Sequence, residues 1–342
     1  MLSRVAENIY WLARYLERAE NTARLLAANA NLHLDLPCGI TPAWEPLIAM
    51  AGARKLFEQQ HPDYSEKEVV KFMIGCDKNP SSILSSLRAA RENARTIRDY
   101  LPREAWELIN KHHLDASEQL DEGLSKRGRH EYLKRVILTS QTLNGLLAGT
   151  MNHDQGYHFL LLGRNIERAD MTTRIIDVRT DGLLPLESAE LRPFETIQWV
   201  SLLRSLSAYQ MYRRSMQARV RKGDVMIFLF QSQDFPRSIR HNLCSIERSL
   251  KTLPNHESAV QSLYEIKSSI LSTQFGKMNC GSLHDFIDQV QIALDQVHAE
   301  ISRAWFLPAQ CSTHREPVLV SSGKGMQCRS NSAQLIASAS YR

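Results

Sequence analysis

The chain has 342 residues, of which 43% are hydrophobic and 23% are charged, and this composition is that of a folded globular protein rather than a disordered or fibrous one. Its length can bury one large hydrophobic core or two small ones. A formal net charge of +5 allows an anionic partner, but it falls short of the strongly basic face that nucleic-acid-binding domains carry. The charge therefore does not favour nucleic acid as a partner.

Cysteine spacing and apolar run length indicate the cellular compartment. The six cysteines are scattered without a Cys-x-x-Cys pair, and so predict neither a zinc ribbon nor a disulfide framework. The longest apolar runs, such as VMIFLF at 225–230, are far shorter than the roughly 20 residues that cross a bilayer. Glu7, Glu17 and Glu20 argue against an organellar transit peptide, because such peptides lack acidic residues. We therefore expect a cytoplasmic protein with no membrane contact.

The residue types predict an all-α fold, because Ala, Leu, Arg, Glu and Gln are plentiful and no stretch sustains the period-2 alternation of a strand. Thr41 and Asn79, each followed by proline, have the pattern of a helix start, and Ser65 with Glu68 has capping-box spacing. In chain order the predicted helices lie near 2–33, 42–60, 65–74, 80–100, 103–126, 129–151, 156–180, 193–220, 236–252, 256–275 and 282–306.

Short connections between these long segments favour a multi-helix antiparallel bundle. We assign 1–307 to one helical domain, within which 1–150 and 151–307 are candidate halves of an internal repeat. Residues 308–342 are rich in Ser, Gly, Gln and Asn, and are predicted to form a flexible tail. The SSGKG at 321–325 lacks the spacing and the preceding strand of a phosphate-binding loop.

A charged ten-residue segment occurs twice in similar form, as YLERAENTAR at 15–24 and as NIERADMTTR at 165–174. The charges recur 150 positions apart, while Asn21 is replaced by methionine: Arg14, Glu17, Arg18, Glu20 and Arg24 return as Arg164, Glu167, Arg168, Asp170 and Arg174. A third predicted helix, SSLRAARENARTIRDY at 85–100, carries Arg91, Glu92 and Arg95 along one face. All of these residues are candidate site residues.

The first copy of the motif lies in a helix that is apolar nearly all round, since Tyr10 and Trp11 share the charged side, and such a helix is usually covered on both faces. Covered charges must be paired, and an acidic group is expected between Arg14 and Arg18. One interpretation is a set of interhelical ion pairs that fixes the register of two pseudo-symmetric halves. The other is that surplus arginines grip a carboxylate or phosphate in bidentate fashion.

Other clusters give weaker signals. His112, His113 and Asp115, and the group around His153 and Asp154, are interpreted as surface and capping residues, because the Glu-x-x-His spacing of a di-metal bundle site is absent. We expect no metal and no cofactor. A basic run contains Arg213, Arg214, Arg219 and Arg221. By default it complements a helix dipole, and the alternative is a docking patch for an anionic partner.

Five collinear blocks closely resemble the bacterial alpha-E family, an α-helical domain with a conserved Glu-Arg motif: MLSRVAENIYWLARYLERAENTARLL, RENARTIRDYLPREAWELIN, YHFLLLGRNIERADMTTRIID, WVSLLRSLSAYQMYRR and FPRSIRHNL. The resemblance implies a helical fold. It also implies a genomic association with a circularly permuted ATP-grasp ligase, encoded beside it or fused to it, and often with a transglutaminase-like protease. The family's motif falls on Arg14, Glu17, Arg18, Arg164, Glu167 and Arg168.

The leading hypothesis is a non-catalytic accessory protein that presents an acidic peptide or carboxylate substrate to an ATP-grasp peptide or amide ligase. An alternative from another class is an enzyme of amide-bond formation or transfer in which Glu17 or Glu167 acts as a general base. A further alternative is a structural or interaction bundle in which the Arg-Glu stripes serve only as an ion-pair lock.

Overall fold

Every regular element in the described part of the chain is helical, as the sequence predicts. The computed structural model describes residues 1–35, 44–180, 192–217 and 219–307. The α-helices are α1 Ser3–Asp35, α2 Glu45–Met50, α3 Arg54–Glu58, α4 Glu66–Gly75, α5 Ile83–Thr96, α6 Arg103–Glu118, α7 Leu120–Leu124, α8 Arg129–Thr150, α9 Gln155–Thr180, α10 Arg192–Ser205, α11 Tyr209–Met216, α12 Lys222–Gln231, α13 Ile239–Leu250, α14 Glu257–Ser272 and α15 Cys280–Ile301. Short 3-10 turns η1 Arg98–Tyr100 and η3 Phe275–Lys277 and the π-helical η4 Ser302–Phe306 complete the set.

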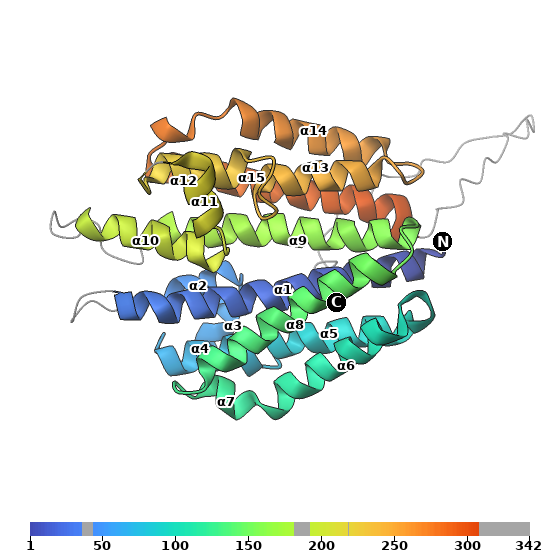
Figure 1. Cartoon of the computed structure of the whole chain (residues 1–342), viewed down its shortest axis with the longest axis horizontal. Coiled ribbons are helices and arrows are strands. Elements are labelled where there is room, and N and C mark those ends of the chain that lie inside the picture. The colour runs from blue at the N-terminus through green and yellow to red at the C-terminus, as the bar shows by residue number, and fades with distance from the viewer. Residues whose placement is uncertain (36–43, 181–191, 218, 308–342) are drawn as a thin grey trace, which may run out of the picture. The chain divides into compact units, whose positions relative to one another are not determined.

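Helices α1 and α9 lie side by side at the centre of the bundle (Figure 1). They run in the same direction, because contacts between them advance together along both helices, from Met1 with Gln155 to Arg14 with Glu167. Helices α5, α6 and α8 lie on the α1 side, and α13, α14 and α15 lie on the α9 side. The two motif-bearing helices are therefore covered on both sides, as their nearly all-round apolar character requires.

The central helices approach very closely at Gly163 of α9. A Cβ atom placed there would lie 2.1 Å from the backbone oxygen of Tyr10 in α1. Real Cβ atoms do not approach an oxygen so closely, and only glycine fits this crossing. The close approach places the charged stretches that follow on α1 and α9 directly opposite each other.

The two candidate halves repeat the same packing. Helix α5 packs on α1 as α13 packs on α9, and α2 packs on α9 as α10 packs on α1. Both α5 and α13 begin after a Pro-x-Ser sequence. The serine hydroxyl, from Ser82 or Ser238, accepts the backbone N–H three residues later.

Several predicted helix limits are wrong. The segment predicted as 42–60 divides at Gly52, which has φ +65, and the one predicted as 193–220 divides at Ser207, which has φ 53. Helix α5 is capped by Ser82 and not by Asn79, and Ser65 precedes α4 without a side-chain cap bond. The start signal at Thr41 and the predicted tail at 308–342 lie outside the described residues.

Two further predicted helices do not continue unbroken to their expected ends, whereas α1, α8 and α9 agree with prediction to within two residues at each end. The predicted 103–126 is interrupted between α6 and α7, and the predicted 282–306 ends its α-helical part at Ile301 before η4. No helix in the described ranges combines the length and the apolar character that crossing a membrane requires.

Candidate functional site

The two motif glutamates exchange ion pairs across the interface of α1 and α9. Arg18 of α1 pairs with Glu167 of α9, with 2.5 Å between Nε and Oε1 and 3.0 Å between Nη2 and Oε2. The reciprocal pair joins Arg168 to Glu17, at 2.8 Å from Nε to Oε1 and 2.6 Å from Nη2 to Oε2. Both pairs are bidentate, and both carboxylates are buried.

Each glutamate also binds a second arginine, and here the two copies differ. Arg14 donates from Nε to Oε2 of Glu167 at 2.7 Å, so that Glu167 lies between Arg14 and Arg18 as the sequence led us to expect. The corresponding place at Glu17 is taken by Arg237, whose Nη1 lies 3.1 Å from Oε1, and not by Arg164. The repeat is therefore approximate at its centre.

Arg237 is the residue that the sequence analysis missed. It stands just before the serine cap of α13 and is buried, and it reaches Asn21 Oδ1 at 2.7 Å and Glu20 Oε1 at 2.5 Å. The equivalent position before the α5 cap is Ser81. Two signals in the sequence mark Arg237: its position inside a Pro-x-Ser cap, and its position in the FPRSIRHNL block that resembles the alpha-E family.

A second layer of pairs lies one turn further along each helix. Arg24 donates to Glu20 at 2.9 Å and to the Ser207 hydroxyl at 2.7 Å. Its counterpart Arg174 donates to Asp170 at 2.9 Å and to the Met50 carbonyl at 3.1 Å. These contacts tie α9 to the C-terminal end of α2 and α1 to the segment that follows α10.

Burial and pairing act in opposite directions on the glutamate pKa values. Burial alone would raise the pKa of Glu167, but the Arg18 and Arg14 guanidinium groups outweigh it and lower this pKa to about 2. The same competition, with Arg168 and Arg237 as the cations, holds the pKa of Glu17 far below its usual range. At neutral pH both carboxylates are therefore ionised and paired with arginines.

Comparison with known proteins agrees with this geometry. The family model for alpha-E, described as a predicted alpha-helical domain with a conserved ER motif, matches residues 1–306. The chain belongs to the alpha-E family. Glu-Arg dipeptides occur at 17–18, 167–168 and 247–248 within the matched range, and the first two supply the four residues of the reciprocal pairs.

Relatives of this alpha-E chain are longer than it is. A protein of Mycobacterium bovis described as uncharacterized is 25% identical over 274 residues, which cover 73% of this chain and 30% of that protein. A Mycobacterium tuberculosis protein with the same description is 24% identical over the same shares. The chain thus spans less than a third of the length of these relatives. No solved structure matches it.

One motif arginine of the alpha-E domain remains outside the ion-pair network. Arg164 is partly buried, and its Nε finds no hydrogen-bond partner among the residues that the structure describes. Burial lowers its pKa, and the neighbouring Arg168 lowers it further. Because Arg237 occupies the place at Glu17 that the repeat assigns to Arg164, the alpha-E core holds one more guanidinium group than a symmetric exchange would need.

The network reaches a small cavity at Arg24. The cavity has a volume of about 100 Å³ and lies where α1, α8 and α10 meet. Its lining is basic and polar at several points, with Arg24 buried and Arg204 exposed. The lining residues are Arg24, Ala27, Ala28, Asn31, Ile137, Ser201, Arg204 and Ser205.

The third charged helix does not join the motif. On α5, Arg91 donates to Asn110 at 2.6 Å, and Arg95 pairs with Glu92 at 2.9 Å. Neither arginine contacts the motif glutamates in the described structure. These three candidates form a separate, partly exposed stripe.

The basic run lies at the surface around the end of α11 and the start of α12. Arg213 and Arg214 lie in the last turn of α11, and Arg219 and Arg221 follow it. All four side chains are exposed, and within the described ranges none of them forms an ion pair. We call these four residues the basic patch.

The histidine clusters differ in part from expectation. His112 is buried and contacts the Ser140 hydroxyl at 3.3 Å, so interpreting it as a surface residue is wrong. Burial lowers its pKa to about 4. Asp154 does cap α9, accepting the backbone N–H of Gly156 at 2.8 Å.

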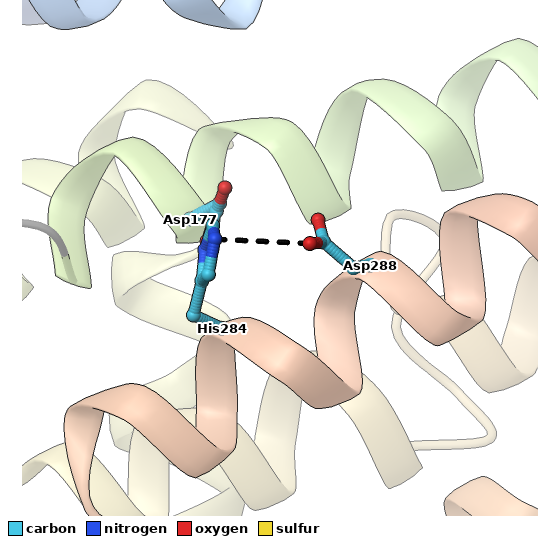
Figure 2. A group of neighbouring side chains, drawn as sticks. All are labelled: Asp177, His284 and Asp288. Atoms are coloured by element: carbon cyan, nitrogen blue, oxygen red, sulfur yellow. Dashed lines mark hydrogen bonds and ion pairs between the residues drawn. The ribbon is translucent and has the colours of Figure 1, made fainter.

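A different group of metal-ligating side chains is formed by Asp177 of α9 with His284 and Asp288 of α15 (Figure 2). None of these three residues is among the candidates predicted from the sequence. The signal available was a histidine and an aspartate four residues apart on one predicted helix, while Asp177 is distant in sequence.

Proposed function

We propose that this alpha-E domain is a non-catalytic accessory of a cytoplasmic ATP-grasp peptide or amide ligase, and that it holds an acidic peptide or carboxylate substrate for that enzyme. The observation that carries the proposal is the state of the two motif glutamates. A general base needs a pKa near the working pH and access to a substrate proton. Glu17 and Glu167 are buried, doubly ion-paired and of lowered pKa, which disfavours the enzymatic alternative.

The Glu-Arg motif has a structural role in this proposal. The reciprocal bidentate pairs fix the register of α1 against α9. Arg237 attaches the segment that precedes α13 to this pair of helices. A buried network of charges keeps the helices rigid only while every charged group in it has an ion-pair or hydrogen-bond partner. The rigid helices then position whatever surface meets the ligand or partner.

The cavity beside Arg24 is the proposed place for a carboxylate. Arg24 uses one N–H of each of its three nitrogens on Glu20 and Ser207, which leaves two of its five N–H donors. Ser201, Arg204 and Ser205 line the same space. A volume of about 100 Å³ suits a single carboxylate side chain rather than a whole cofactor.

The basic patch is the proposed docking surface for the ligase. Its four exposed arginines form no ion pair with any residue that the structure describes, and they fit an acidic protein surface by charge complementarity. The matched region covers only 30% of each mycobacterial relative, which supports an alpha-E domain that functions together with further protein domains.

Co-purification tests the partnership. The tagged chain is isolated from its native host, and bound proteins are identified by mass spectrometry. We expect an ATP-grasp ligase, with or without a transglutaminase-like protease, and we expect Arg213→Glu with Arg214→Glu to release it. Arg248→Glu, a charge reversal at an exposed position of α13, is the matched control. Recovery of neither protein, or equal release by the control, contradicts the proposal.

Ligand binding is tested separately with a triglutamate peptide in isothermal titration calorimetry. Binding is expected to weaken at least 10-fold in Arg204→Ala and to persist in Arg248→Ala. Turnover of peptide and ATP by the isolated chain, lost in Glu17→Gln with the fold intact, would instead establish the enzymatic alternative.

A further inference from the structure

The group formed by Asp177, His284 and Asp288 links two helices far apart in sequence. His284 and Asp288 are separated by one turn of α15, and Asp177 reaches them from the C-terminal part of α9 (Figure 2). The Nδ1 atom of His284 lies 2.7 Å from Oδ1 of Asp177, and its Nε2 atom lies 3.7 Å from Oδ2 of Asp288. One ligand atom from each residue falls within 4.8 Å of the others.

The shorter contact fixes the histidine tautomer. An ionised carboxylate only accepts hydrogen bonds, so Nδ1 must carry the proton that it donates to Asp177. In a neutral imidazole, Nε2 then carries a lone pair, and Oδ2 of Asp288 lies 3.7 Å from this nitrogen. Two such electron-rich atoms do not stabilise each other at this separation, whereas a cation that binds both of them would.

The separation of these two atoms suits a metal ion. Zinc–nitrogen bonds are about 2.0–2.1 Å long and zinc–carboxylate bonds about 2.0–2.2 Å, so one ion can span 3.7 Å with an open ligand angle. A carboxylate behind the imidazole is the usual partner of a metal-binding histidine, because it sets the tautomer and orients the ring. The His284 side chain is 39% exposed and that of Asp288 53%, which leaves room for water ligands.

We propose that this group binds a divalent metal ion of the zinc class. His284 Nε2 and Asp288 are the direct protein ligands, and Asp177 positions the imidazole. One nitrogen and one carboxylate oxygen favour a borderline ion over magnesium or calcium, which prefer oxygen ligands. Because Asp177 lies on the motif helix α9, a bound ion strengthens the attachment of α15 to that helix. This proposal does not depend on the ligase partnership.

Zinc chloride is the probe in an isothermal titration of the purified full-length chain at pH 7.5, with circular dichroism to verify the fold of each variant. One saturable site is expected in the unmodified chain. His284→Ala and Asp288→Asn should each lose it, and Asp177→Asn should weaken it by about 10- to 100-fold. His130→Ala removes an exposed histidine that also lies beside an acid, Glu131, and should leave binding unchanged.

The competing state is a histidinium ion held between two aspartates. Its signature in an NMR titration is a His284 ring that remains protonated above pH 7.5 and whose resonances do not shift on addition of zinc. That result overturns the proposal, and so does zinc binding that is equal in the unmodified chain and in His284→Ala.

Discussion

At the scale of single residues, the central feature is the dependence of each motif carboxylate on arginines from another helix. Glu167 lies between Arg14 and Arg18, and its side chain is 1% exposed. Removing its charge leaves two guanidinium groups without their counter-ion in the bundle interior. Buried pairs that lose one partner are costly, whereas exposed pairs contribute little.

We therefore expect Glu167→Gln to lower the free energy of unfolding by about 3–5 kcal/mol. Urea denaturation followed by circular dichroism measures the change. Glu131→Gln on α8 is the control, because that side chain is 56% exposed and should leave stability nearly unchanged. Equal behaviour of the two variants would show that the motif is not a structural lock.

The depressed pKa of Glu167 makes stability depend on pH. The pKa of a glutamate in an unfolded chain is about 4.3, whereas the pKa of Glu167 in the folded chain is about 2. The stabilisation is therefore complete above about pH 5 and is lost as the pH falls toward 2. Urea midpoints at pH 7, 4 and 3 should fall less steeply in Glu167→Gln than in the unmodified chain. Parallel curves would be inconsistent with this assignment.

At the scale of elements, the crossing of α1 and α9 depends on Gly163. A methyl group at this position meets the Tyr10 carbonyl and must separate the helices that carry the motif. Gly163→Ala is expected to cost about 1–3 kcal/mol or more, as overpacking does. Thermal unfolding of this variant is compared with that of Gly145→Ala, where nothing lies within 4 Å of the added Cβ. The control should gain up to about 1 kcal/mol from helix propensity.

Helix periodicity predicted most of the elements but not their interruptions. The break after α10 has no proline or glycine to announce it. Ser207 adopts φ 53 there, and its hydroxyl accepts a hydrogen bond from Arg24 of α1. A contact between segments more than 180 positions apart accompanies this local conformation, and local propensity cannot reveal it.

The candidate site was predictable only where the sequence repeats itself. Arg18 and Glu167 stand out because their spacing occurs twice, and embedded charges require partners. Arg237 has no copy in the other half, and so its place at Glu17 could not be inferred. The stripe with Arg91 shares the composition of the motif, but it lies on α5 and forms its own pairs.

At the scale of the whole molecule, the candidate halves 1–150 and 151–307 share their buried charges. Glu17 belongs to the first half, yet Arg168 and Arg237 of the second half neutralise it. We expect calorimetric unfolding of the chain to show one cooperative transition, because neither half alone supplies the bidentate arginine partner of its motif glutamate, Glu17 or Glu167. Two separate transitions would indicate that the halves are independent domains.

The replacement of Arg164 by Arg237 at Glu17 also has an evolutionary consequence. The first-half carboxylate Glu17 is bound by Arg237, and the position in its own half that is equivalent to Arg237 is Ser81, so the two copies of the motif are no longer interchangeable. Substitutions at 17 and 237 should be accepted only together, whereas a substitution at 164 breaks no ion pair among the described residues. Among diverging sequences, covariation should therefore join 17 with 168 and 237, and 167 with 14 and 18.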